Sequence, residues 1–341
     1  MSDQLQSFYA RNRTHNDISQ RGAIGNLNDG IEITTHGLDT RLIAWPGTGF
    51  YMESIHMLTL KPGDESDMYC YAVSEEGMLC LKGSGQVFLR GQWIDIEAGD
   101  IAYYPEGIGH AIRNNGNDGS TKDFVLITSI SQPPFQLYEA AGYYDKGRCV
   151  MNYERIDEER KNASPNHENK MLSLKNELHL NESFPKMRAW NLSAEEIRTK
   201  GALFNVFKGA DFGGIDVPMR LILWPAYGTR SVGFHLGYLK PGDETAIHTH
   251  PISDEIVLQF AGASEAYVGD GWAAVGANDC VMAPRGVFHG GRLSKESTPP
   301  DGRVLVGGFA SPPQIDLYFK AGYYDCDHDG KFTNLPYTNL I

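Results

Sequence analysis

Short apolar runs separated by turn-forming residues make up the pattern of hydrophobic and polar positions along this chain. Residues 245–249 have no helical period, and the run 255–260 is rich in residues that suit a pleated sheet. Turn formers at 251–254 stand between them, so the pattern predicts two strands joined as a hairpin. A further strand is predicted at 280–283, and the next begins at His289. The pattern as a whole favours antiparallel β-structure.

The same pattern occurs twice in the chain. Arg41–Pro46 returns as Arg220–Pro225, and Leu60–Asp64 returns as Leu239–Asp243, each time 179 residues later. The offset also relates Trp93 to Trp272, Pro105 to Pro284, His110 to His289 and Pro133 to Pro312. After one inserted residue, Ala141–Asp145 returns as Ala321–Asp325. The sequence therefore predicts two tandem copies of one structural unit.

A change of composition separates the two copies. Seven of the eight positions 154–161 are charged and turn formers follow at 162–166, which predicts a solvated helix end and a linker. Ser193, with Glu196 three residues later, predicts the start of a second helix. We therefore expect an N-terminal barrel over residues 1–148, a linker with helical segments over 149–200, and a C-terminal barrel over 201–341.

Candidate chemistry concentrates in the second copy. His248, His250 and Glu255 lie within eight residues, and His289 follows. Residues two apart on a strand share a face, so the first two histidines are expected to enter one pocket, and the predicted hairpin returns Glu255 beside them. Three imidazoles and one carboxylate suit a divalent transition metal, with Fe(II) expected first and Mn(II), Ni(II), Co(II) or Zn(II) as alternatives. Such an ion would keep a charge of +1 and two open positions, which favour an anionic oxygen donor.

These residues resemble the two motifs of the cupin superfamily. The first motif, G-x5-H-x-H-x4-E-x6-G, is matched in full by Gly242, His248, His250, Glu255 and Gly262. The second, G-D-x4-P-x-G-x2-H-x3-N, is matched by Asp279, Pro284, Gly286 and His289, with Asn278 in place of its first Gly and Leu293 in place of its Asn. The resemblance implies an all-β bicupin, two tandem double-stranded β-helix (jelly-roll) barrels with short connecting helices. It also implies a homodimer.

The first copy lacks the histidine pair. Tyr69 and Tyr71 stand at the positions of the two neighbouring histidines, while Glu76 and His110 are kept. Tyrosine binds iron as a phenolate, and its ordinary pKa near 10 opposes that form at neutral pH. We therefore expect one metal site, in the C-terminal barrel, and a degenerate site in the other.

Strand alternation and loop position give the candidates for the walls of the site. Val257 and Gln259 share the face of Glu255, so Gln259 is expected to reach a bound substrate. Arg285 would pair with a substrate carboxylate if it turned inward and is otherwise a solvated surface residue. The further lining candidates are His235, Tyr267, Trp272 and Phe288.

Three classes of function follow from the resemblance. The three-histidine, one-glutamate set looks like that of quercetinase and acireductone dioxygenase, which implies an Fe(II) dioxygenase acting with O2 on a small aromatic or enediol substrate. Gentisate-type enzymes usually lack the Glu. In this class Glu255 also serves as a base, and Gln259 and Tyr267 are candidate catalytic residues. The alternatives are a metal-dependent sugar or keto-acid isomerase or lyase, with His235, Tyr267 or Glu265 as base, and a binding protein without turnover.

Composition limits the partners and the compartment. Of 341 residues 41% are hydrophobic and 21% charged, and the net charge of −13 argues against nucleic acid or an anionic membrane as partner. No apolar run approaches the ~18 residues of a membrane span. Five cysteines without a C-x-x-C fit reduced thiols in a cytoplasmic protein. They are Cys70, Cys80, Cys149, Cys280 and Cys326.

Overall fold

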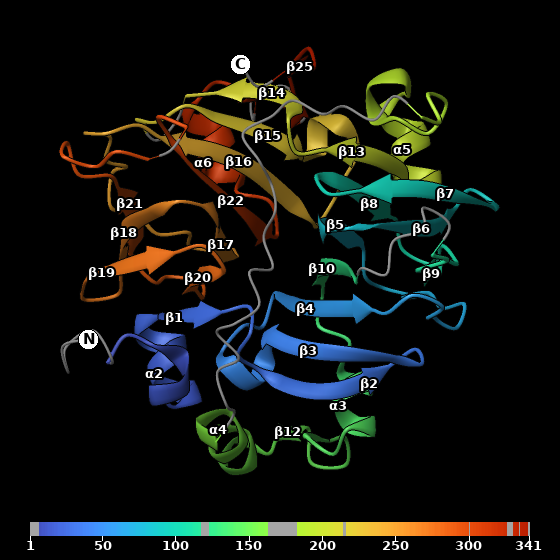
Figure 1. The fold of residues 1–341 in the computed structure, drawn as a ribbon, viewed down its shortest axis with the longest axis horizontal. Helices are drawn as coiled ribbons and strands as arrows, with labels where there is room; N and C mark the ends of the chain where they lie inside the picture. Colours follow the sequence, from blue (N-terminus) through green and yellow to red (C-terminus); the bar gives the residue numbers. More distant parts are fainter. Residues whose placement is uncertain are drawn as a thin grey trace.

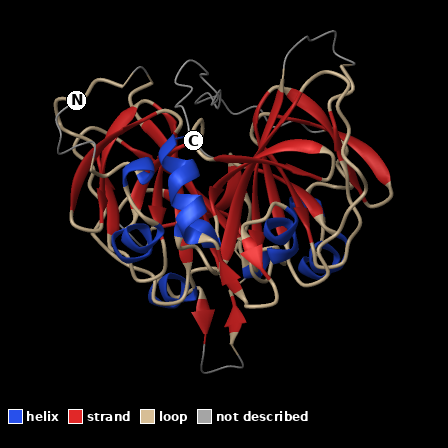
Figure 2. Cartoon of the chain, turned by 90° about the horizontal axis from the view of Figure 1, so that it is seen from below, coloured by secondary structure: helices blue, strands red, loops and turns tan. Residues whose placement is uncertain are grey.

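Two β-barrels joined edge to edge form the body of the molecule (Figure 1). They are seen in a computed structural model that describes residues 7–116, 123–162, 183–213, 216–299, 301–325, 330–333 and 335–339. Figure 2 shows the two strand-rich halves side by side. The expected all-β fold with tandem barrels and short connecting helices is confirmed.

Strands account for most elements of the first half. They are β1(Ala23–Asn26), β2(Ile31–Thr35), β3(Leu38–Ala44), β4(Glu53–Leu60), β5(Glu76–Lys82), β6(Ser84–Leu89), β7(Gln92–Glu97), β8(Asp100–Tyr104), β9(Ile112–Arg113), β10(Phe124–Ser131), β11(Tyr144–Asp145) and β12(Val150–Met151). The helices are η1(Ala10–Asn12), α2(His15–Arg21), η2(Pro46–Thr48), α3(Phe135–Ala140) and α4(Tyr153–Asn162).

The second half repeats this order. Its strands are β13(Ala202–Asn205), β14(Lys208–Phe212), β15(Met219–Leu223), β16(Gly233–Leu239), β17(Asp254–Ala261), β18(Ala263–Val268), β19(Gly271–Gly276), β20(Asp279–Ala283), β21(His289–Arg292), β22(Val304–Ser311), β23(Tyr324–Asp325), β24(Lys331–Phe332) and β25(Thr338–Asn339). The helices are η3(Ala189–Asn191), α5(Ala194–Lys200), η4(Pro225–Tyr227) and α6(Ile315–Lys320).

Each barrel is closed by a large and a small sheet. The small sheets are β7-β6-β9 in the first copy and β19-β18-β21 in the second. The large sheets continue into one another in the order β1-β20-β17-β22-β16-β15-β14-β13-β8-β5-β10-β4-β3-β2. Since buried residues of both copies share one hydrophobic cluster, the two barrels have a common core.

The two copies exchange their first strands. β1 pairs with β20 of the second barrel, and β13 pairs with β8 of the first (Figure 1). Each exchanged strand ends in the same polar contact. Asn26 Nδ2 donates to Asp279 Oδ1 at 2.7 Å, and Asn205 Nδ2 donates to Asp100 Oδ1 at 3.0 Å. Each of these strands thus belongs to one copy by sequence and pairs with a strand of the other copy. The predicted domain boundaries at 148 and 200 stay a prediction.

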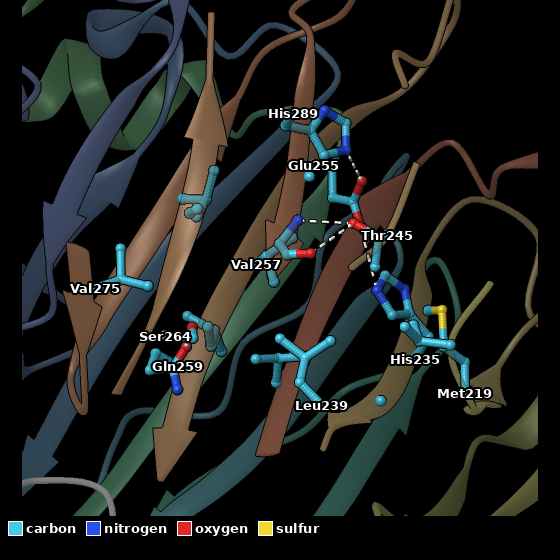
Figure 3. A pocket seen from close by; sticks show the side chains of 18 of the residues that line it. Met219, His235, Leu239, Thr245, Glu255, Val257, Gln259, Ser264, Val275 and His289 are labelled. Carbon is cyan, nitrogen blue, oxygen red and sulfur yellow. Dashed lines mark hydrogen bonds and ion pairs between the residues drawn. The ribbon is translucent and has the colours of Figure 1, made fainter. Parts of the chain in front are cut away.

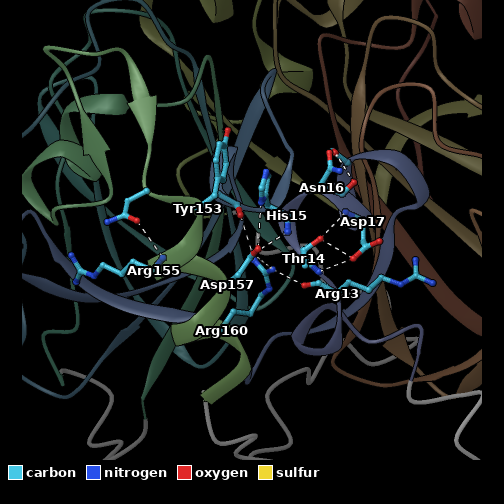
Figure 4. Close-up of polar contacts among 12 residues, drawn as sticks. Arg13, Thr14, His15, Asn16, Asp17, Tyr153, Arg155, Asp157 and Arg160 are labelled. Atoms are coloured by element: carbon cyan, nitrogen blue, oxygen red, sulfur yellow. Dashed lines mark hydrogen bonds and ion pairs between the residues drawn. The ribbon is translucent and has the colours of Figure 1, made fainter.

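Helix α4 occupies the charged stretch that was expected to be a solvated helix end (Figure 4). Ile156 and Arg160 on this helix are buried, so the expected solvated helix end is solvated on one side only. The reason is that the Arg160 guanidinium donates to the backbone carbonyls of Ala10 (3.1 Å) and Arg13 (2.7 Å). The turn formers from 163 onward lie outside the described residues.

Helix α5 begins as the sequence predicts. Ser193 is its N-cap, and Ser193 and Glu196 bond reciprocally as a capping box. The four described cysteines, Cys70, Cys80, Cys149 and Cys280, are free thiols, as expected, and Cys326 lies outside the described residues. None of the helices in the described part of the chain is long and apolar enough to cross a membrane.

The predicted hairpin around the histidine pair is replaced by a crossing between sheets. Residues 245–249 form no regular strand, and His248 makes an isolated bridge to His289 at the edge of the small sheet. Glu255 lies on β17, whose described partners are β20 and β22 in the large sheet. The candidate ligands therefore face one another from two sheets, and not from a paired hairpin.

Candidate metal centre

Four side chains converge inside the second barrel. The ligand atoms of His248, His250, Glu255 and His289 all lie within 4.8 Å of one another. Glu255 Oε2 is 2.8 Å from His289 Nε2 (Figure 3). The same oxygen is 2.9 Å from His250 Nε2. This is the set of donors that the sequence predicts.

Backbone carbonyls fix the orientation of two of the imidazoles. His248 Nδ1 lies 2.8 Å from the carbonyl oxygen of Ala246, and His289 Nδ1 lies 3.0 Å from that of Val287. Because a carbonyl only accepts, Nδ1 carries a proton in both rings, and Nε2 of each ring faces the site, where a bound ion would take the place of any proton on it. Metal-binding histidines commonly have such a partner on the second nitrogen. The residues present therefore fit a divalent ion.

The charge state of the cluster also suits a cation. Burial raises the pKa of Glu255, but hydrogen bonds and charge from His250 and His289 outweigh it and hold the pKa well below its ordinary value. Burial, and next the neighbouring His289, lower the pKa of His248 to about 4. At neutral pH the site thus presents an ionised carboxylate and a neutral His248, which are the forms that bind metals.

A cavity of about 80 Å³ adjoins the cluster (Figure 3). His248, Glu255 and His289 lie in its wall, together with the predicted lining residues Val257 and Gln259. Most of the remaining wall is aliphatic, including Met219, Leu239, Val275, Val281 and Val306. The ion site therefore opens onto a small apolar chamber.

Side-chain size contributes to the room inside this chamber. At three positions of the cavity wall, the second copy has a smaller residue than the first copy. The three larger residues of the first copy are all buried in the hydrophobic cluster inside the first barrel. The pairs are Met78 and Val257, Val87 and Ala266, and Ile96 and Val275. At these three positions larger side chains thus occupy, in the first barrel, the space that borders the cavity in the second.

Comparison with known proteins supports the fold. The model of the family described as Cupin domain matches residues 56–124, and no curated protein matches the sequence. Solved structures match over both barrels. Protein Ylba from E. coli has a TM-score of 0.55 at 11% identity, over 85% of this chain and 90% of that one. A putative glyoxylate-induced protein from Pseudomonas aeruginosa has 0.52 at 14%, over 82% and 84%.

A variant of oxalate decarboxylase from Bacillus subtilis has a TM-score of 0.51 at 14% identity, over 93% of this chain and 88% of that one. The chain has the bicupin fold. One departure from the second cupin motif is explained by the structure, because Asn278, in place of the usual Gly, adopts a φ of 76°. Asparagine tolerates this left-handed conformation better than most residues.

Four predicted lining residues of the bicupin are absent from the described residues of the cavity wall: Tyr267, Trp272, Arg285 and Phe288. On β18 the inward positions are Ala266 and Val268, which are buried, so alternation turns Tyr267 to the other face. There its ring contacts Trp272, with centroids 5.6 Å apart. Arg285 and Phe288 are exposed, so no guanidinium from that loop enters the cavity.

His235, which the sequence left open between packing and chemistry, lines the cavity. Its Nε2 is 3.3 Å from Glu255 Oε1 (Figure 3). Gln259 also lines the cavity, but its amide is engaged by the protein. Its Nε2 donates to the Ala261 carbonyl at 3.0 Å, and its Oε1 accepts from Ser264 at 2.9 Å. Of the two, His235 is the closer neighbour of the metal ligands.

Gln314 is a residue of the site that sequence reasoning missed. It is buried at the N-cap of α6, lines the cavity, and places its Nε2 3.0 Å from His250 Nε2. The one-residue insertion between Pro312 and Ala321 is the sequence signal that marks this turn. An amide at this place provides a neutral hydrogen-bonding group at the edge of the ion site.

The first barrel keeps two of the four candidate ligand residues, Glu76 and His110. His110 Nε2 lies 2.7 Å from Glu76 Oε2, as in the second barrel. Burial, and next the Glu76 charge, raise the pKa values of Tyr69 and Tyr71 well above the ordinary value. His36 stacks on Tyr69 at 3.7 Å. The phenols are therefore neutral, which agrees with the expected degenerate site.

Proposed function

We propose that this bicupin is a mononuclear metal enzyme, most simply an Fe(II) dioxygenase acting on a small aromatic or enediol substrate. The observation that carries the proposal is the convergence of three imidazoles and one carboxylate within 4.8 Å at the wall of an apolar cavity. When bound, the ion would supply Lewis-acid activation and orientation of a substrate oxygen and O2.

Residues of the chain would bind the ion, exclude water and offer a hydrogen bond. His248, His250, Glu255 and His289 would hold the ion, and Glu255 supplies the one negative charge. Aliphatic side chains of the cavity exclude water from the reacting groups. Gln314 offers a neutral hydrogen bond at the edge of the site.

The lining of the cavity supports a substrate of low charge. None of the described residues that line it is Lys or Arg, so a second anionic group would meet no fixed cation there. A site of about 80 Å³ is also small beside the ~150 Å³ cavity that admits benzene. A compact molecule with one acidic hydroxyl fits these properties better than a dicarboxylate or a bulky flavonol.

A lyase or isomerase is the second candidate, favoured by two observations. The fold resembles that of oxalate decarboxylase, and the Bacillus subtilis enzyme has Mn(II) centres. In addition, burial lowers the pKa of His235 in the cavity, so its imidazole is neutral and able to accept a proton at neutral pH. In this reaction class the metal would polarise a carbonyl while His235 moves the proton.

Metal analysis followed by oxygen consumption tests the proposal. The protein is expressed with iron or with manganese, its metal content is measured, and O2 uptake is followed with catechols, gentisate, salicylates and flavonols. We expect one metal ion per chain and substrate-dependent O2 uptake that is lost in His250→Ala. Bound metal without O2 uptake, but with CO2 release from oxalate or proton exchange in a keto-sugar, would contradict the dioxygenase proposal and support the lyase or isomerase. Metal without turnover would indicate a binding protein.

A further inference from the structure

The residue before the ligand glutamate connects the two barrels. Asp254, which precedes Glu255, is 2% exposed, and its Oδ2 accepts hydrogen bonds from the backbone N–H groups of Tyr51 and Met52, both at 2.7 Å. These two residues lie in the first copy, directly before β4. The start of β17 in the second barrel is therefore held by the backbone of the first.

The equivalent contact runs in the opposite direction. Glu75, which stands 179 residues before Asp254 and precedes Glu76, accepts from the backbone N–H groups of Arg230 (2.9 Å), Ser231 (2.7 Å) and Val232 (3.2 Å). These residues directly precede β16, the counterpart of β4. We call the two contacts together the inter-barrel clasp.

The two halves of the clasp differ in their further partners. Asp254 Oδ1 also accepts from the backbone N–H of Arg285 at 2.7 Å, in the loop that leads to His289. The additional partners of Glu75 are two hydroxyl groups, those of Tyr103 at 2.6 Å and Ser231 at 3.0 Å, which both donate to its carboxylate. Only Asp254 thus joins the strand of the carboxylate ligand, the loop before a histidine ligand and the other barrel.

We propose that Asp254 is a positioning residue that holds Glu255 and His289 at the ion site against the first barrel. The proposal rests on the metal site of the proposed function. Three short hydrogen bonds to one carboxylate fix the backbone on both sides of the cluster. The barrel without the histidine pair then has a role in metal binding, because its residues 51 and 52 supply two of the three donors.

Asp254→Asn and Glu75→Gln form a matched pair of variants, because each weakens one half of the clasp. Co(II) is titrated into each full-length protein, and its visible spectrum reports the ligand set. We expect Asp254→Asn to lower Co(II) affinity about 10–100-fold and to change the spectrum, as loss of an outer partner of a metal ligand does. Glu75→Gln should leave the affinity within about 2-fold while lowering the melting temperature comparably. Asp254→Glu should recover part of the affinity.

Amide hydrogen exchange in the metal-free proteins gives a second measurement. Faster exchange at 254–257 and 285–289 in Asp254→Asn, but not in Glu75→Gln, supports the proposal. Equal losses of Co(II) affinity in the two variants, or unchanged exchange in these segments, would overturn it. If the wild-type protein binds no Co(II), the proposed metal function fails, and the exchange measurement still decides the positioning role.

Discussion

His250 and Tyr71 occupy equivalent places in the two barrels and differ in what they offer an ion. The His250 Nε2 lies 2.9 Å from the ligand carboxylate of Glu255. Tyr71 is buried, and burial followed by the Glu76 charge raises its pKa well above the ordinary value. The phenol therefore keeps its proton at neutral pH and is a poor ligand.

We accordingly expect His250→Ala to reduce metal affinity by at least the ~10–100-fold that loss of an outer partner costs. Tyr71→Ala should leave the stoichiometry at one ion per chain. Titration with Mn(II), followed by electron paramagnetic resonance, measures both. If Tyr71→Ala removes the metal and His250→Ala does not, the site lies in the other barrel.

Glu53 gives the stability of the protein a dependence on pH. It is fully buried, and burial, then the charge of Asp254, raise its pKa well above the ordinary value. The folded state therefore holds this proton more tightly than the unfolded state. The stabilisation is complete below the ordinary pKa of 4.5 and is lost as the pH rises through the raised folded value.

Glu53→Gln imitates the protonated form. We expect it to change the free energy of unfolding little at pH 4 and to raise it by at least about 1 kcal/mol at pH 8. Urea unfolding at the two pH values measures the difference, with the exposed Glu158→Gln as control. An equal effect of Glu53→Gln at both pH values would show that folding does not raise the pKa of this carboxyl.

Residues that share one short segment carry a local sequence signal, whereas some residues placed by the tertiary fold carry none. The spacing of His248, His250 and Glu255 identified the cluster because each lies at a defined step in one short segment. Gln314 lies 64 residues from His250 and reaches it only through a turn at the start of α6. Tyr267 was assigned to the cavity without the alternation of β18, which turns it away.

At the scale of the element, one position on β17 contributes to the difference between the cavity and the equivalent space in the first barrel. Val257 lines the cavity, while Met78 at the same position on β5 is fully buried in the first barrel. The longer thioether side chain would occupy the space next to the metal ligands. The space for a substrate thus depends on the volume of the side chain at this position, whereas metal binding depends on the three histidines and Glu255.

Val257→Met should therefore keep one metal ion per chain and raise KM or abolish turnover of the dioxygenase substrate found in the oxygen-uptake screen. Met78→Val is the matched control in the first barrel. It should cost on the order of 1–2 kcal/mol of stability through the cavity it leaves and should not change turnover. Metal analysis with steady-state kinetics measures the first effect and urea unfolding the second. Unchanged kinetics in Val257→Met would mean that the substrate binds elsewhere.

The elements themselves were largely predictable, but their pairing was not. Alternation and turn residues identified the strands now seen as β17 and β20, and the repeat identified their counterparts in the first barrel. The crossing at 251–253 between two sheets was read as a hairpin because a turn looks the same in sequence whether or not the strands beside it pair. The solvent exposure of α4 was overestimated for a similar reason, since the carbonyl partners of Arg160 lie about 150 residues earlier in the chain.

At the scale of the whole molecule, the exchanged strands make each barrel incomplete without the other. β1 covers the edge of β20, and β13 covers the edge of β8. Their loss would expose unpaired backbone groups along both edges. The common hydrophobic core adds to this dependence.

We expect the full chain to unfold in a single cooperative transition. Differential scanning calorimetry should give a calorimetric enthalpy equal to the van't Hoff enthalpy, because neither barrel keeps its large sheet after the other unfolds. Removal of the metal should shift the whole transition to lower temperature without splitting it. Two separate transitions would show that the exchanged strands contribute little.

The strand exchange has a consequence for the history of the chain. After a duplication, a copy that loses its chemistry is free to disappear only if the surviving copy folds without it. Here a lineage that discarded the first barrel would also discard the strand that completes the sheet of the second. The shared sheet is thus a structural reason for keeping a barrel that has tyrosines in place of the histidine pair.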